Sequence, residues 1–213
     1  MKDIYKTIAT ISKGYITEQR SRFISFAIPV QTPEEVKEKV ETFRKQYYDA
    51  HHVCWAYMLG VERLQYRVND DGEPSSTAGK PILSVINSHG LTNILIVVIR
   101  YFGGVKLGTS GLITAYRAAA LDAVSQAEII EKTVDEIISI KFPYQFLNEV
   151  MKIVKEMNPQ IITQKFEIEC EMTLQIRRGE MEKLRNRLLK VESVIATSDE
   201  RRVTSDERRD SIF

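Results

Sequence analysis

The sequence predicts an α+β protein of two domains. Segments in which apolar and polar residues alternate are interleaved with segments of helical spacing along the 213 residues. The character of the chain changes after Glu128, where a second series of strands and helices begins. The length suits one or two domains, since domains average about 100–200 residues. We therefore place a boundary near Ala127–Thr133, with domains over 1–130 and 134–200 and a tail over 201–213.

The first domain is expected to begin with strands and a capped helix. Residues 21–30 alternate between two faces, and residues 5–30 together predict a hairpin and a neighbouring strand. The next segment has helical spacing: Thr32 can cap it, Pro33 fits the first helical position and Glu35 completes a capping box. The residues predicted to face the core are Val36, Val40, Phe43 and Tyr47.

The centre of the first domain is expected to return to strands before its last helix. The apolar run "NILIVVIRYF" is long enough for a central strand that is buried on both faces. The predicted elements are strands over 51–59 and 63–68, a loop over 70–81, a short helix over 82–90 closed by Gly90, a strand over 93–102 and a helix over 111–127.

The second domain is predicted to consist of a strand, a helix, two strands, a helix and a strand. The predicted elements are a strand over 134–144, a helix over 145–157, two strands within 160–178 around a turn near Thr163–Lys165, a helix over 179–191 and a strand over 193–198. The order βαββαβ is that of a ferredoxin-like module. Such a module has one antiparallel sheet with both helices on one face.

Composition excludes several classes of protein. Lys and Arg number 30 and Asp and Glu 29, which leaves a net charge of +1. Any anion site must therefore be local, because no global field attracts nucleic acid or membranes. Two cysteines far apart suit a reducing compartment. The N-terminus lacks the apolar core of a signal peptide, and the longest apolar run, Ile94–Ile99, is too short to span a bilayer. We therefore expect a cytoplasmic protein.

A glycine-rich junction between a strand and a helix is the first candidate site. "RYFGGVKLGTSG" places Gly103, Gly104, Gly108 and Gly111 where a buried strand ends and an Ala-rich helix begins. Glycines let a ligand or another backbone approach closely, and a helix N-terminus offers unpaired N–H groups with partial positive charge. Thr109 or Ser110 can cap this helix.

Three cationic side chains near this junction favour the binding of an anion there. Lys106 lies within it, Arg100 at the end of the strand and Arg117 about two turns into the helix. Together with the backbone amides of Gly104, Gly108 and Ser110 they would receive a phosphate or carboxylate. The spacing matches neither a Walker A loop nor a dinucleotide fingerprint. The alternative is that the glycines only permit a tight turn, and that the anionic partner of Arg100 and Arg117 is Asp70, Asp71 or Glu73.

An acidic loop is the second candidate site. "NDDGEPSSTAGKP" places Asp70, Asp71 and Glu73 around Gly72. Carboxylates on a loop can hold Mg²⁺ or act as a general base, although the spacing is not that of an EF-hand. The alternative is a polar turn whose Asp side chains bond to the backbone. No other cofactor is expected.

Two weaker candidates lie on the strand before this loop. His51, His52 and Cys54 suggest a metal site, but no fourth ligand is near and the two histidines point to opposite sides of a strand. Trp55 and Tyr57 offer faces for base stacking, or they belong to the core.

The two candidate sites together resemble a known family. "DDGEPSSTAGKPIL", "LTNILIVVIRYFGGVKLGTSGLITAYRAA", "SRFI" and "HHVCWAYMLG" are similar to the pattern of the IMPACT family, whose bacterial members are often called YigZ-type proteins. The match covers residues 16–127, and the rest resembles the small C-terminal domain of bacterial members. The resemblance implies a ribosomal protein S5 domain 2-like fold for the first domain, shared with elongation factor G domain IV, and an elongation factor G domain V-like fold for the second.

The resemblance also implies a link to translation. Eukaryotic relatives act in translational control, so we expect a regulatory or binding protein that docks on RNA or a ribosome-associated factor through the glycine junction. The alternative is a metal-dependent enzyme acting on a small phosphorylated or nucleotide substrate. That alternative requires the acidic loop and the glycine junction to converge in space.

Overall fold

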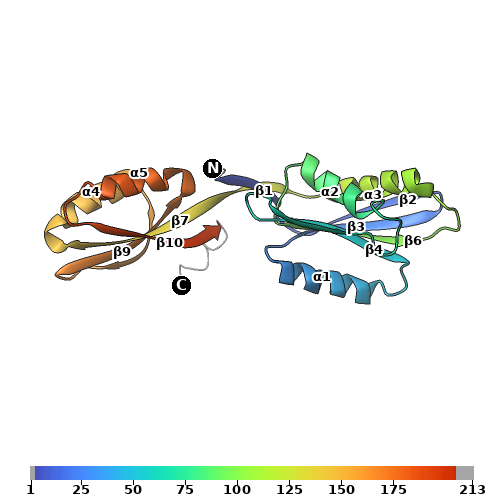
Figure 1. Cartoon of the computed structure of the whole chain (residues 1–213), viewed down its shortest axis with the longest axis horizontal. Coiled ribbons are helices and arrows are strands. Elements are labelled where there is room, and N and C mark those ends of the chain that lie inside the picture. The colour runs from blue at the N-terminus through green and yellow to red at the C-terminus, as the bar shows by residue number, and fades with distance from the viewer. Residues whose placement is uncertain (1–2, 205–213) are drawn as a thin grey trace. The chain divides into compact units, whose positions relative to one another are not determined.

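The computed structural model describes residues 3–204, with side chains described as far as residue 197. Within that range the chain is α+β, with two five-stranded sheets and five α-helices. It divides into two compact units, one formed by Tyr5–Glu131 and the other by the residues on either side of it (Figure 1). No helix in the described range is both long and apolar enough to cross a membrane.

The first unit is built on an antiparallel sheet of order β2-β3-β6-β4-β5. The hairpin predicted near the N-terminus is β2–β3, whereas the neighbouring β1 pairs with β7 in the other sheet. The strands are β1 (Ile4–Ile8), β2 (Ser12–Glu18), β3 (Ser21–Pro29), β4 (His52–Leu59), β5 (Gln65–Asn69) and β6 (Ile94–Tyr101).

The central strand β6 confirms the prediction of burial on both faces. Every side chain from Ile94 to Ile99 is fully buried. Ile94, Ile96 and Val98 face one hydrophobic core, and Leu95, Val97 and Ile99 face the other. Because side chains alternate along a strand, Arg100 continues the first of these faces. The strand therefore delivers a cation to the end of an apolar stripe.

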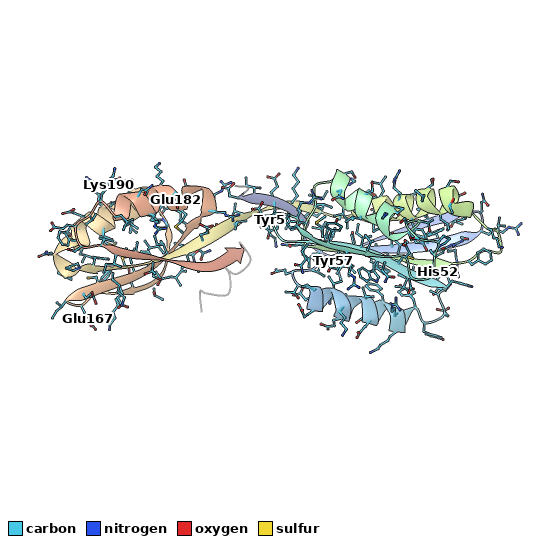
Figure 2. All side chains as sticks on the ribbon, in the orientation of Figure 1. Tyr5, His52, Tyr57, Glu167, Glu182 and Lys190 are labelled. Carbon is cyan, nitrogen blue, oxygen red and sulfur yellow. The ribbon has the colours of Figure 1, made fainter. Side chains whose placement is uncertain are left out.

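Helices cover both faces of this sheet. Figure 1 shows α1 (Pro33–Gln46) on one face and α2 (Gly79–Ser88) with α3 (Gly108–Ser125) on the other. The predicted cap of α1 is confirmed, since the Thr32 side chain accepts a hydrogen bond from the Glu35 N–H at 3.2 Å and Pro33 opens the helix. Figure 2 shows Tyr57 between the sheet and α1.

Helix α3 lies close to the sheet because its inner face is small. Four alanines of α3 are buried in the core that it shares with α2. Ser25 of β3 donates a hydrogen bond to the Ala119 carbonyl at 2.6 Å, and Ser12 of β2 donates to the Ala123 carbonyl at 2.7 Å. These contacts hold α3 firmly, so its N-terminus has a fixed position beside the end of β6.

The second unit has the predicted element order βαββαβ. Its elements are β7 (Ile129–Pro143), a 3₁₀ turn (Tyr144–Phe146), α4 (Leu147–Met157), β8 (Gln160–Lys165), β9 (Glu169–Arg177), α5 (Arg178–Leu188) and β10 (Ile195–Thr204). The pairings β10–β7, β7–β9 and β9–β8 are all antiparallel. Figure 1 shows α4 and α5 on the same face of these strands.

Two boundaries in this unit differ from the prediction. The turn between β8 and β9 lies at 166–168 rather than near Thr163–Lys165. Phe166 and Ile168 are exposed there, the latter by 94%, so apolar residues that extend the alternating pattern belong to the turn and not to the core. The last strand runs to Thr204, beyond the start of the predicted tail, and residues 205–213 lie outside the described residues.

Candidate functional site

The two candidate loops meet at the end of β6. Arg100 donates a hydrogen bond from Nη1 to Glu73 Oε1 at 2.6 Å, and this is also an ion pair between two almost fully buried side chains. The expected alternative, that Arg100 pairs with an acid of this chain, is therefore confirmed. Arg100 is neutralised by Glu73 and is not available as a free phosphate ligand.

Three neighbours fix the position of Arg100. Its Nη2 lies 3.5 Å from the Ser21 Oγ, and its guanidinium lies 5.6 Å from the ring centres of both Phe23 and Phe102. Its Nε is buried and has no hydrogen-bond partner in the described structure. A cation held against aromatic faces in this way is attracted by the partial negative charge on those faces.

Glu73 is also the centre of a buried polar cluster that sequence reasoning missed. Tyr116 of α3 donates a hydrogen bond to Glu73 Oε1 at 2.8 Å, and His52 Nε2 lies 3.8 Å from the same oxygen. The Cys54 thiol lies 3.4 Å from the Tyr116 hydroxyl and donates to the Asp70 carbonyl at 3.0 Å. Burial raises the pKa of both Cys54 and Tyr116, so the thiol and the phenol stay protonated and act as donors.

The Asp70 carboxylate binds backbone N–H groups that follow it in the chain. Its carboxylate accepts hydrogen bonds from the N–H groups of Ser76, Ala78 and Gly79 at 2.8–3.0 Å, which caps the start of α2. Desolvation opposes ionisation of Asp70, but these three donors outweigh it and lower its pKa. This matches the expected alternative of an Asp that bonds to the backbone.

The Asp71 carboxylate has different partners from that of Asp70. Its Oδ1 accepts from Arg44 of α1 at 2.5 Å, and its Oδ2 accepts from the Val53 N–H at 2.7 Å. Asp70, Asp71 and Glu73 therefore engage three different sets of partners and do not converge. Among residues 3–197, no three His, Cys, Asp or Glu side chains are arranged to hold a metal ion, and this includes His51, His52 and Cys54.

The glycines of the junction have different roles. A Cβ on Gly103 would lie 2.1 Å from the carbonyl carbon of Arg20, so Gly103 admits the β2–β3 turn. Gly104 and Gly108 have φ angles of +87° and +70° and open space where a side chain would be. The first glycine is explained by packing, whereas the other two shape the chain and leave the surface beside it clear.

The N-terminus of α3 is open. The helix begins at Gly108, its N-cap residue is Leu107 in helical conformation, and no side chain caps it. The prediction that Thr109 or Ser110 caps the helix is therefore wrong, because both residues lie inside the first turn. Gly108, Thr109 and Ser110 are exposed, as is Lys106.

A pocket of about 320 Å³ joins this helix end to the acidic loop. The sequence-predicted residues that line it are Glu73, Arg100, Lys106 and Gly108. Arg117 does not line it and is exposed further along α3. The pocket is completed by Pro74, Phe102, Leu107, Thr109 and Leu112. The convergence that the enzyme hypothesis requires is thus present.

Comparison with known proteins gives a consistent result. Residues 19–124 match the model of the Impact N-terminal domain. The chain is 35% identical over 152 residues to IMPACT family member YvyE of Bacillus subtilis, which covers 71% of this chain and 70% of that protein. It is 33% identical over 151 residues to IMPACT family member YigZ of Escherichia coli, covering 70% and 74% of the two chains.

More distant similarities extend this pattern. The human protein named Protein IMPACT is 33% identical over 98 residues, which is 44% of this chain and 30% of the human protein. A crystal structure described only as a hypothetical protein superposes with a TM-score of 0.69 at 26% identity. That superposition covers 94% of this chain and 99% of the solved one. The similarity to YvyE and YigZ extends over most of both chains.

Proposed function

The chain belongs to the IMPACT family, and on that premise we propose that it is a translation-linked binding protein. It docks on RNA, or on a ribosome-associated factor, through the glycine junction. The observation that carries the proposal is the open N-terminus of α3, which forms one wall of the 320 Å³ pocket. Backbone N–H groups at such a helix end, without a side-chain cap, favour a phosphate oxygen.

The charges of the pocket limit which residues contact the anion. Arg100 and Glu73 neutralise each other, so they contribute structure and little net field. Lys106 is exposed at the rim and forms no ion pair within the described part of the chain. Lys106 and the amide of Gly108, which line the pocket, therefore provide the main phosphate contacts. The amide of Ser110, which does not line it, is proposed as a further contact. Arg117 is proposed as an outer contact, reached only by a ligand that extends along α3.

The architecture supports the same proposal at a coarser level. We propose that the first unit has the ribosomal protein S5 domain 2-like fold and the second a ferredoxin-like fold similar to elongation factor G domain V. The second assignment is supported by the strand order β10-β7-β9-β8 and by the two helices on one face. Both folds recur in proteins that contact structured RNA, but fold alone assigns no partner.

The enzyme hypothesis has one supporting observation. The acidic loop and the glycine junction do converge, as an enzyme acting on a phosphorylated substrate requires. Its three carboxylates are nevertheless engaged with backbone N–H groups, Arg44 and Arg100. A divalent cation needs several oxygens directed at one point. We therefore favour binding over catalysis.

The proposal is tested by sedimentation of the protein with ribosomes over a range of salt concentrations. We expect co-sedimentation at low salt that weakens as salt rises, because phosphate contacts release counterions. Lys106→Ala should weaken binding and reduce the slope of log affinity against log salt by about 1. Arg117→Ala should have a smaller effect.

Lys45→Ala is the matched control, because Lys45 is an exposed cation on α1, on the other face of the sheet. It should leave sedimentation unchanged. The folded state of each variant is checked by circular dichroism. If the folded protein fails to sediment with ribosomes at any salt concentration, or if Lys45→Ala is as damaging as Lys106→Ala, docking through the glycine junction is wrong.

A further inference from the structure

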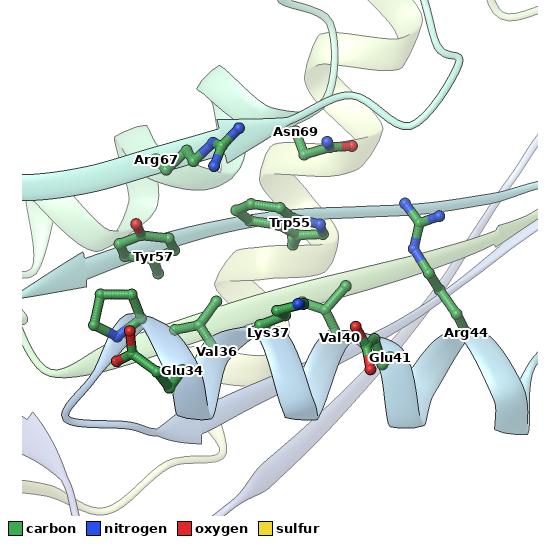
Figure 3. A pocket seen from close by; sticks show the side chains of 11 residues that line it. Glu34, Val36, Lys37, Val40, Glu41, Arg44, Trp55, Tyr57, Arg67 and Asn69 are labelled. Carbon is green, nitrogen blue, oxygen red and sulfur yellow. The ribbon is translucent and has the colours of Figure 1, made fainter.

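A second and larger pocket lies on the opposite face of the same sheet. It has a volume of about 620 Å³ and lies between α1 and strands β4 and β5 (Figure 3). Small-molecule sites usually have volumes of about 300–1,000 Å³. None of the residues that line it lines the pocket at the glycine junction. It is therefore a separate candidate site.

Two aromatic rings form one wall of this pocket. Trp55 and Tyr57 occupy alternate positions of β4 and thus share a face. Their rings are nearly parallel, at 12°, with centres 6.0 Å apart. Figure 3 shows them side by side along the strand, with Val36 and Val40 of α1 facing them. Aromatic rings on one side and aliphatic groups on the other suit a flat ring.

Unused hydrogen-bond donors lie at the same wall. The Trp55 Nε1 is buried and has no hydrogen-bond partner among the described residues. This nitrogen has almost no accessible surface, so a ligand in the pocket does not contact it. Asn69 of β5 lies directly opposite Trp55, and its side-chain oxygen is bonded to the Asp71 N–H, which leaves its amide donors for other partners.

The rim carries charged side chains of both signs. Arg67 lies opposite Tyr57 on β5, is exposed, and forms no ion pair within residues 3–197. The α1 side carries Glu34 and Glu41 with Lys37 between them, and Arg44 is bonded to Asp71. The β5 rim thus offers a cation for an anionic group, and the α1 rim offers carboxylates that accept hydrogen bonds from hydroxyls.

We propose that this pocket binds a nucleoside monophosphate. The base lies in the pocket against the Trp55–Tyr57 wall, with an acceptor on its edge facing the Asn69 amide. Arg67 binds the phosphate, and the carboxylates on α1 bind ribose hydroxyls. A flat heteroaromatic ring, several hydroxyls and one anion are the three features that the walls complement.

Trp55 makes the proposal directly testable, because it is the only tryptophan of the chain. The four nucleoside monophosphates are titrated into the full-length protein while tryptophan fluorescence is recorded. We expect saturable quenching by at least one of them, and weaker quenching by the matching nucleoside, which lacks the phosphate. Inorganic phosphate alone should cause none. A single-stranded tetranucleotide is the second probe, and binding by it alone would overturn the assignment to a mononucleotide.

Variants separate the parts of the site, with affinities measured by calorimetry. Trp55→Ala should weaken binding about fivefold or more, as expected for loss of base stacking. Trp55→Phe keeps a ring and should retain part of the affinity. Arg67→Ala should weaken binding of the monophosphate and leave binding of the nucleoside unchanged. Lys80→Ala, which removes an exposed cation of α2 on the other face of the sheet, should change neither.

Absence of quenching by every nucleotide at millimolar concentration would overturn the proposal. So would equal loss of nucleoside and monophosphate affinity in Arg67→Ala. Ribosome binding through Lys106 is independent of this pocket. A protein that sediments with ribosomes but binds no mononucleotide, or the reverse, therefore identifies which of the two proposals is wrong.

Discussion

Glu73 is the residue on which the junction between the two loops depends most. Its carboxylate neutralises the charge of Arg100, whose side chain is 6% exposed, and accepts a hydrogen bond from the Tyr116 hydroxyl. Glu73→Gln would leave a buried guanidinium without a countercharge, so we expect a loss of about 3–5 kcal/mol in the free energy of unfolding. Chemical denaturation at neutral pH measures it.

An exposed ion pair provides the comparison for that variant. Glu171 binds Lys141 at 2.5 Å, but both side chains are about half exposed. Solvent screens such a pair, so Glu171→Gln should change stability far less than Glu73→Gln. Equal effects of the two substitutions would contradict the view that burial gives the Glu73–Arg100 pair its importance.

Asp70 gives the stability of the protein a defined dependence on pH. Its pKa is lowered in the folded state, so its contribution is fully present above the pKa of an unfolded Asp, about 3.9, and is lost as pH falls through the lower folded value. Asp70→Asn should cost about 1–3 kcal/mol at neutral pH, because both carboxylate oxygens accept N–H groups and an amide nitrogen cannot. The difference between the two proteins should shrink below about pH 4.

Urea unfolding of both proteins at neutral and acidic pH measures this difference directly. Because Asn does not titrate, the variant should lose less stability on acidification than the parent protein. A difference that stays constant over the acidic range would mean that the Asp70 carboxylate does not favour its charged form in the fold.

The glycine junction, as an element, combines two separate requirements that a pair of alanine variants can distinguish. At Gly103 the added Cβ would collide with backbone atoms of Arg20 and Ser21, whereas at Gly104 it would meet nothing but must adopt a φ of +87°. Left-handed conformation costs an ordinary residue about 1–2 kcal/mol. We expect Gly103→Ala to destabilise the protein more than Gly104→Ala does, as measured by denaturant midpoints. The reverse order would contradict this account of the close approach.

Periodicity predicted the helices and the central strand well because these elements depend on their own residues. The cap of α1 and the double burial of β6 follow from local sequence. The cap of α3 was mispredicted, since Thr109 and Ser110 are suitable residue types but lie two and three residues after the N-cap position at Leu107. The β8–β9 turn was misplaced because Phe166 and Ile168 continue an alternating pattern while they lie outside the core.

The candidate site was predicted in its parts, and Glu73 was one of three acids proposed as the partner of Arg100, but the sequence did not distinguish among the three. Sequence identified the acidic loop and the glycine junction, but the partner of Arg100 depends on which strands are neighbours in the sheet. Arg100 pairs in register with both Phe23 and His52, which lie far from it in the chain. The same pairing explains why Ser21 was missed. Tyr116 was missed because it reaches Glu73 from α3, and no local pattern marks such a contact.

At the scale of the whole molecule, the chain has separate hydrophobic cores in its two units, and each should respond to its own substitutions. Ile96 of β6 is fully buried in the first unit and Leu184 of α5 in the second. Replacing either by Ala should cost about 2–5 kcal/mol, because a cavity remains where the side chain was. In calorimetry we expect Ile96→Ala to lower the transition of the first unit and Leu184→Ala that of the second. If both variants shifted one common transition by the same amount, the two units would have to unfold as a single cooperative body, and the second unit would then contribute directly to the stability of the site in the first.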